Sequence, residues 1–231
     1  MIALSHVDSF YDRSQILHDV SLEAPTRGVL CVLGRNGTGK TTLLKTLMGL
    51  TDRTTGRILL DDQDVSRAPT FARARAGLGY VPQGRQIIPD FTVRENILMG
   101  AFARTDGKRQ IPDLVPQLFP YLVANLDRPG GLLSGGQQQQ LAIARALASN
   151  PKALLLDEPT EGIQPNIVEE IEDIVLRLNR EQGLTIILVE QSIAFARKAA
   201  DMFVMLEKGR IAASGRRGEL TDELIHRHLM V

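Results

Sequence analysis

The stretch GRNGTGKTT, residues 34–42, has the residue types and spacing that bind a phosphate chain. It matches the pattern G-x-x-x-x-G-K-[ST], in which glycines let the backbone aim its N–H groups at phosphate oxygens. The helix expected after the loop adds the positive end of its dipole. Lys40 would supply a full charge to the β- and γ-phosphates, and the Thr41 hydroxyl is a suitable ligand for Mg²⁺. The predicted nucleotide-binding residues of this loop are Gly34, Arg35, Asn36, Gly37, Thr38, Gly39, Lys40, Thr41 and Thr42.

Two adjacent carboxylates, Asp157 and Glu158, follow the apolar run of residues 153–156. At the end of a buried strand beside a phosphate loop, Asp157 would hold Mg²⁺ and Glu158 would orient and partly deprotonate an attacking water. The alternative is a pair of solvated carboxylates without a chemical role. The phosphate loop in the same chain favours the first interpretation, and together the two motifs predict hydrolysis of ATP as a magnesium complex.

Gln191 follows the apolar run TIILVE, residues 185–190, and is a third candidate at a strand end. Its carboxamide has a donor and an acceptor but no proton to exchange near neutral pH. It can therefore orient a phosphate or a water, but it cannot act as a base.

Another anion-binding element begins at residue 133. Ser134 is a good N-cap, and the glycines after it open a helix whose N–H groups and dipole require an anion. Lys40 already serves the nucleotide of this chain, and this second helix start is an anion-binding element separate from the phosphate loop. The residues of the element are Leu133, Ser134, Gly135, Gly136 and Gln137.

These candidates need a sheet to position them. The continuously apolar runs at 28–34, 153–156 and 185–190 predict parallel strands that are covered on both faces. More alternating segments at 2–11, 16–25 and 202–215 predict antiparallel strands with one wet face. Between them, residues 166–183 have one apolar stripe and predict an amphipathic helix.

The segment from 87 to 150 shows helical patterns without a convincing strand, and TVRE at 92–95 predicts a capping box. We therefore expect an ATP-binding core, residues 1–86 and 151–231, with a helical subdomain inserted at 87–150.

Composition limits the function classes. The chain has 231 residues, with 27 basic and 27 acidic side chains, so no net positive charge points to nucleic acid. Its single cysteine, Cys31, excludes an internal disulfide and suggests an intracellular protein. No apolar run approaches the roughly 18 residues that span a bilayer, and no secretory signal is visible at the amino terminus.

The phosphate loop, LLLDEP and LSGGQ together resemble the ATP-binding subunits of ABC transporters, along the whole chain. The resemblance implies an α/β fold: a P-loop NTPase (RecA-like) core with an antiparallel β subdomain and an inserted α-helical subdomain. It implies that the element at 133–137 faces the ATP held by the opposite subunit. Tyr11 would stack on adenine, while its neighbour Phe10 is expected to point into the core. Gln83 would contact the metal and the catalytic water and report to a membrane partner; Ile87, Ile88 and Phe91 would either lie near that partner or pack in the core.

Two positions depart from the family pattern. Glu161, Gly162, Ile163 and Gln164 replace the usual Ser-Ala-Leu-Asp, so communication across a subunit pair is expected to differ. Gln191 stands where most members place a histidine against the γ-phosphate. We therefore expect this chain's own ATP site to be weakened and to rely on a second, non-identical ATPase that carries the histidine.

Within the family, the chain resembles the branched-chain amino acid and urea importers, most of all the urea-type second ATPase. The motifs that carry this resemblance are LDEPTEGIQP, SGGQQQQLAIARALA, GRNGTGKTTLLKTLMGL and LVEQ. The resemblance implies transmembrane permease subunits, indirectly a periplasmic or extracellular binding protein, and a peripheral place on the cytoplasmic face of the cell membrane. Urea is the expected cargo, with branched-chain amino acids or short amides as the alternative. An ABC-type ATPase acting on DNA or ribosomes would show a coiled-coil insertion or a basic surface. A small-molecule kinase would not need the element at 133–137.

Overall fold

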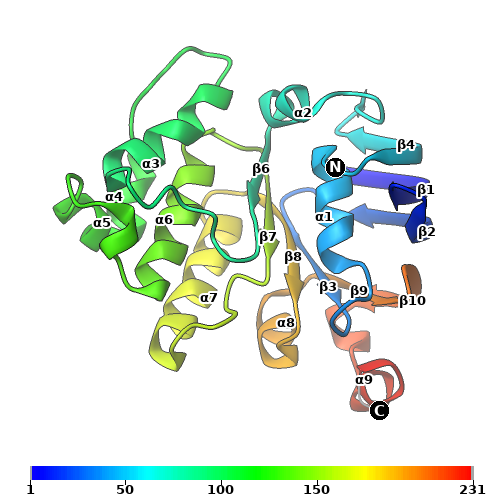
Figure 1. Ribbon diagram of the computed structural model, residues 1–231. Coiled ribbons are helices and arrows are strands. Elements are labelled where there is room, and N and C mark those ends of the chain that lie inside the picture. The colour runs from blue at the N-terminus through cyan, green and yellow to red at the C-terminus, as the bar shows by residue number, and fades with distance from the viewer. Residues whose placement is uncertain (1, 230–231) are drawn as a thin grey trace.

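The structure, a computed structural model, describes residues 2–229 and contains two β-sheets flanked by helices (Figure 1). The larger sheet has six strands in the order β10-β9-β3-β8-β7-β6. Neighbouring strands are parallel except at β10, which is antiparallel to β9. The strands are β3 (Val29–Leu33), β6 (Leu78–Val81), β7 (Ala153–Asp157), β8 (Thr185–Glu190), β9 (Met202–Glu207) and β10 (Arg210–Arg216). The continuously apolar runs of the sequence are thus the central strands β3, β8 and β7, fully buried as predicted.

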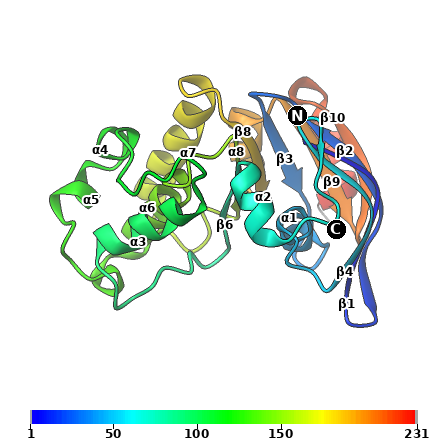
Figure 2. The same cartoon turned by 90° about the horizontal axis from the view of Figure 1, so that it is seen from above.

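The smaller sheet is antiparallel, in the order β2-β1-β4-β5. Helix α1 (Lys40–Met48) lies between this sheet and the larger one, as Figure 2 shows. Leu43, Leu44 and Leu47 of α1 are fully buried and join apolar side chains of both sheets in one core. The helix is thereby fixed on two sides, with its N-terminus at the end of β3. The strands are β1 (Ile2–Tyr11), β2 (Ser14–Ala24), β4 (Arg53–Leu60) and β5 (Gln63–Asp64).

Phe10 lies outside this core, so the prediction that it points inward is wrong. Its ring is only half-buried, and the Arg53 guanidinium lies 3.8 Å from the ring centroid. The pairing of β1 with β2 shifts register between Leu4 and Val7. Leu4 is buried before this shift, and Val7 and Ser9 are buried after it, so the next residue, Phe10, falls on the other face. Such an irregularity breaks the simple in–out alternation on which the prediction rested.

The other face of the larger sheet is covered by α6 (Gly135–Leu147), α7 (Pro165–Arg180) and α8 (Ile193–Ala199). The predicted amphipathic helix is α7, whose buried stripe includes Ile171, Ile174, Val175 and Leu178. Gly183, in the left-handed conformation with φ 65°, follows the helix and donates its N–H to the Asn179 carbonyl. The apolar periodicity therefore predicts the buried face of this helix, and Gly183 predicts where the helix ends.

Between β6 and β7 the chain is mainly helical. Its elements are α3 (Val93–Gly100), a 3₁₀ turn η1 (Ala101–Ala103), α4 (Leu114–Leu118), α5 (Pro120–Ala124), η2 (Gly130–Leu132) and α6. The capping box predicted at 92–95 is present: the Thr92 hydroxyl accepts from the Glu95 N–H, and the Glu95 carboxylate accepts from the Thr92 N–H. The remaining helical segments are α2 (Thr70–Ala76), η3 (Arg217–Glu219) and α9 (Asp222–Leu229). The fold class predicted from the sequence is confirmed.

The parallel order of β3, β8 and β7 places their carboxyl ends at one edge of the larger sheet. The phosphate loop follows β3, Glu158 follows β7, and Gln191 follows β8. Ligands of open α/β sheets bind at this edge. The three strand ends singled out in the sequence therefore meet in space.

Candidate functional site

The phosphate loop has a backbone that glycine alone can supply at its critical points. Gly39 immediately precedes α1 with φ 105°, and a Cβ there would lie 3.0 Å from the Leu17 side chain. At Gly34 a Cβ would lie 2.6 Å from both the Leu206 carbonyl and the Thr38 hydroxyl. The Gly209 N–H also donates to the Thr38 carbonyl at 2.9 Å, which ties the loop to the β9–β10 turn. The loop is thus held closely around the N-terminus of α1.

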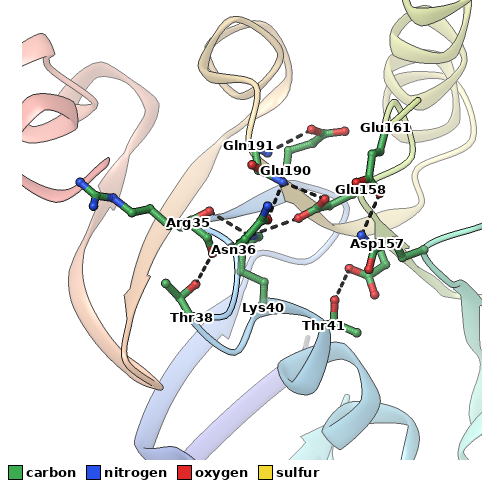
Figure 3. A network of polar contacts seen from close by, with 12 residues as sticks. Arg35, Asn36, Thr38, Lys40, Thr41, Asp157, Glu158, Glu161, Glu190 and Gln191 are labelled. Carbon is green, nitrogen blue, oxygen red and sulfur yellow. Dashed lines mark hydrogen bonds and ion pairs between the residues drawn. The ribbon is translucent and has the colours of Figure 1, made fainter. Parts of the chain in front are cut away.

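Lys40 places its charge in the middle of the site. Its Nζ donates to the carbonyls of Gly34 at 2.8 Å and Arg35 at 2.9 Å, and it forms a 3.1 Å ion pair with Glu158 (Figure 3). The side chains of Lys40 and Glu158 are only 4% and 5% exposed. A buried lysine at the start of α1 adds its charge to the helix dipole, which is the arrangement that a phosphate chain requires.

Asp157 and Thr41 lie side by side, as predicted. The Thr41 hydroxyl donates to Asp157 Oδ1 at 3.0 Å, and the Tyr80 hydroxyl donates to Oδ2 at 3.3 Å. Burial raises the pKa of Asp157, and these hydrogen bonds oppose the rise. A hydroxyl and a carboxylate are the oxygen ligands that Mg²⁺ prefers, so this donor set suits the ion. The sequence did not identify Tyr80, because only the pairing of β6 with β7 brings it beside Asp157.

Glu158 is in contact with Gln191. The Gln191 carboxamide donates to Glu158 Oε2 at 2.9 Å and to the Asn36 side-chain oxygen at 2.9 Å (Figure 3). Glu158 has a left-handed backbone, with φ 46°, and its N–H donates to the Val189 carbonyl. A non-glycine residue in this conformation is a strained position of the kind found at functional sites. The structure therefore brings the predicted base, the strand-end glutamine and the phosphate loop together.

Gln83 follows β6 and points to the loop after β7. Its carboxamide donates to the Glu161 carboxylate at 2.8 Å, and its backbone contributes a hydrogen bond that lowers the pKa of Asp157. Gln83 thus lies beside the expected metal ligand through its backbone, while its side chain contacts a residue of the unusual segment 161–164. Nearby, Ile87 packs against the core, whereas Phe91 is 38% exposed.

A cavity of about 490 Å³ lies beside the phosphate loop, within the size range of small-molecule sites. Tyr11 is not one of its lining residues. Tyr11 ends β1, is partly buried, and lies near enough to contribute to the raised pKa of Tyr80. The lining residues are Ile16, Asn36, Gly37, Gly39, Lys40, Thr41, Thr42, Gln83 and Glu158.

The element at 133–137 opens α6 with a capping box. The Ser134 hydroxyl accepts from the Gln137 N–H at 3.4 Å, and the Gln137 side-chain oxygen accepts from the Ser134 N–H at 3.0 Å. Gly136 allows close packing, because a Cβ there would lie 2.4 Å from the Ile167 side chain. Leu133 is buried, and Gly135 lies beside the Arg85 guanidinium. None of these five residues lines the cavity at the phosphate loop, so the structure does not bring the two anion-binding elements of the chain together.

Comparison with known proteins identifies relatives along nearly the whole chain. The ABC transporter family model matches residues 17–161. The high-affinity branched-chain amino acid transport ATP-binding protein BraG of Pseudomonas aeruginosa is 41% identical over 212 residues, which cover 91% of each chain. The lipopolysaccharide export ATP-binding protein LptB of Escherichia coli is 35% identical and covers 94% of this chain and 91% of its own length.

Solved structures agree with this assignment. A dimeric ATP-binding cassette in a post-hydrolysis state with ADP and inorganic phosphate superimposes with a TM-score of 0.83 at 26% identity. The match covers 94% of this chain and 99% of that one. The phosphate loop, the carboxylates after β7 and the capped start of α6 lie in one such cassette fold, and the chain therefore belongs to the ABC transporter family as an ATP-hydrolysing, ATP-binding subunit.

Proposed function

We propose that the hydrolytic site is the cluster of Lys40, Glu158 and Gln191, with Thr41 and Asp157 as the magnesium ligands. The carrying observation is that three strand ends and the start of α1 bring these side chains within hydrogen-bonding distance of one another. On binding ATP, Lys40 exchanges its loop carbonyls and Glu158 for phosphate oxygens. That exchange releases the Glu158 carboxylate to orient and partly deprotonate water for in-line attack on the γ-phosphate.

The remaining site residues have supporting roles in this proposal. Gln83 contacts the metal shell and the water and carries the state of the site toward the membrane partner through residues 84–91. Tyr11 stacks on adenine. When bound, Mg²⁺ would neutralise charge on the β- and γ-phosphates. We place the boundaries of the ATP-binding core at 1–86 and 151–231, with the helical subdomain at 87–150.

The segment 133–137 binds the ATP of an opposite subunit in this proposal. It offers a capped helix N-terminus with a stretch of small residues, and it is absent from the cavity of its own phosphate loop. Two subunits would close head to tail around their nucleotides, and closing and reopening would move the permeases between states. Because Gln191 lacks a cationic form, we propose that the second subunit is a different ATPase, whose site has the histidine.

The cargo best supported by the relatives is a branched-chain amino acid. Besides BraG, the probable branched-chain amino acid transport ATP-binding protein LivF of Archaeoglobus fulgidus is 35% identical over 225 residues. Urea, the cargo first expected from the sequence motifs, has no support among these relatives and remains the second candidate, on the resemblance of those motifs alone. Another relative is the ATP-binding protein of a lipopolysaccharide export system, so import is proposed from the family resemblance of the sequence motifs and not from these names.

The partners in this proposal are transmembrane permeases, a second ATPase and, indirectly, a periplasmic or extracellular binding protein, with no role for nucleic acid. No helix among residues 2–229 combines the length and apolar character needed to span a membrane. We place the chain at the cytoplasmic face of the cell membrane, held there by the permeases.

The test is reconstitution of the chain with its co-purifying permeases and second ATPase in vesicles. Labelled leucine and labelled urea are offered separately. The cargo and the binding protein are on one side of the vesicle membrane, and ATP is on the side that carries the ATPase subunits. We expect ATP-dependent uptake of leucine that is lost in Lys40→Ala. Uptake of urea instead would overturn the cargo, and no ATP hydrolysis by the wild-type complex would overturn the site.

A further inference from the structure

Glu190, the last residue of β8, is a buried carboxylate that the proposed reaction does not use. Its exposed fraction is 3%. One oxygen accepts from the Thr160 hydroxyl at 2.7 Å and from the Thr160 N–H at 3.3 Å. The other accepts from the N–H groups of Gln191 at 3.1 Å and Ser192 at 3.5 Å. Glu190 therefore has two sets of donors, one on each oxygen.

The charge of this carboxylate is not balanced by a cation. All four donors are neutral, and no lysine or arginine within the described part of the chain is paired with it. Burial raises the pKa of Glu190, and the hydrogen bonds that it accepts oppose this rise. Keeping a buried charge without a cationic partner destabilises the fold. The carboxylate offsets part of this cost, because it accepts from three backbone N–H groups that an apolar side chain would leave without this acceptor.

The donors belong to the two loops that carry the hydrolytic side chains. Thr160 lies two residues after Glu158, and Gln191 directly follows Glu190. The strained Glu158 backbone is also tied to β8 by its hydrogen bond to the Val189 carbonyl. Glu190 thus joins the loop after β7 to the turn after β8, immediately behind the 2.9 Å contact between Gln191 and Glu158.

We propose that Glu190 is a positioning residue for ATP hydrolysis, whose carboxylate sets the distance and angle between Glu158 and Gln191 by holding both of their loops. The inference rests on the proposed role of Glu158 as the base. It assigns no proton transfer to Glu190, which lies behind the reacting groups and does not line the cavity.

The first test compares Glu190→Ala and the isosteric Glu190→Gln with wild type, using the full-length chain. Loss of position at a reacting group can reduce turnover by about 10²-fold, and we expect a fall of that order in kcat for Glu190→Ala. The ATP dissociation constant should stay within about threefold, because the phosphate loop is untouched. Glu190→Gln keeps the shape of the side chain, so it also tests the idea if Glu190→Ala does not fold.

The carboxamide of Glu190→Gln has a preferred orientation. When the carboxamide oxygen faces the backbone N–H groups of Gln191 and Ser192, the NH2 group faces Thr160. The Thr160 hydroxyl can accept from this NH2 group, so only the Thr160 N–H is left opposite another donor. This variant should therefore keep a contact with the Thr160 hydroxyl but lose the hydrogen bond from the Thr160 N–H, and lower kcat by about tenfold, as expected for a hydrogen bond to a charged group.

A double-mutant cycle with Thr160→Val separates positioning from general destabilisation. Thr160→Val should lower kcat in wild type but have little further effect in Glu190→Ala, where no side-chain oxygen remains to accept from Thr160. Ile174→Val, a buried change in α7 away from the site, is the matched control for lost stability and should leave kcat unchanged. Additive losses, or equal losses of kcat and ATP affinity, would overturn the inference.

The result also separates this inference from the proposed function. If wild type hydrolyses ATP and Glu190→Ala does so at the same rate, only the positioning role is overturned. If Glu158→Gln hydrolyses ATP at the wild-type rate, the proposed base fails, and the role of Glu190 fails with it.

Discussion

At the scale of single residues, the candidate site is a small set of polar side chains centred on Glu158. Glu158 is in contact with both Lys40 and Gln191, and all three belong to different strand ends. A group held in this way is well placed to act as a base once ATP takes over Lys40. The function of the site thus depends on the charge of Glu158 more than on its size.

Glu158→Gln is predicted to abolish most turnover while ATP binding is retained. The carboxamide keeps the shape of the side chain but cannot accept a proton, and loss of a positioned base lowers the rate by about 10²–10⁴-fold. Steady-state phosphate release and equilibrium binding of a fluorescent ATP analogue measure the two effects. Glu169→Gln, the same change on the exposed face of α7, is the control and should behave as wild type.

Gln191→His is predicted to raise the ATPase rate of the isolated chain. An imidazole can donate as Gln191 does and also becomes cationic near neutral pH, which favours charge developing on the γ-phosphate. The measurement is kcat at saturating ATP from pH 6 to 8, with the largest gain at the acidic end, where the imidazolium is populated. An unchanged rate across this range would count against a site weakened by its glutamine.

At the scale of elements, the strands that carry the site are buried on both faces, and Cys31 in the middle of β3 reports on their integrity. Its side chain is fully buried, and burial, with nearby Glu190 and Asp201, raises its pKa far above the usual range for a thiol. The thiolate is the reactive form, so a folded β3 protects Cys31 twice, by exclusion and by protonation.

Cys31 is accordingly predicted to be unreactive toward Ellman's reagent at pH 8 in the native chain and fully reactive in guanidinium. In the native chain, Cys31 can react only after local opening of β3 exposes its thiol. The rate of any slow native reaction should therefore be limited by the frequency of that opening. Rapid labelling of the folded chain at pH 8 would show that the central sheet is more open than described.

Some features of these elements could be predicted from the sequence, and others depend on contacts between distant segments. Runs such as 185–190 specify buried strands by composition alone, and the loop at 34–42 specifies its own geometry through glycines. The order of strands in the sheet is not written in local spacing. Tyr80 beside Asp157 and Thr160 beside Glu190 arise from pairings between segments far apart in the chain, and the register shift that turned Phe10 outward gives no local signal.

At the scale of the whole molecule, the chain has two anion-binding elements that do not meet. The phosphate loop lines a cavity to which residues 133–137 contribute nothing. The start of α6 is nevertheless well ordered by its own contacts, because it has a capping box and Gly136 packs closely against α7. This separation fits the proposed head-to-tail pair of subunits, in which each chain would complete the site of the other.

Ser134→Arg is therefore predicted to separate ATP binding from ATP hydrolysis. The variant should bind ATP with wild-type affinity, because its own cavity is unchanged. It should lose most turnover, because the larger side chain and the lost N-cap disrupt the surface that would contact the opposite nucleotide. In size-exclusion chromatography with ATP and Mg²⁺, Glu158→Gln should shift toward a dimer, whereas the double variant with Ser134→Arg should remain monomeric. Ser5→Arg, an exposed serine of β1, is the matched control and should still dimerise. A Ser134→Arg chain that hydrolyses ATP at the wild-type rate as a monomer would show that one chain suffices.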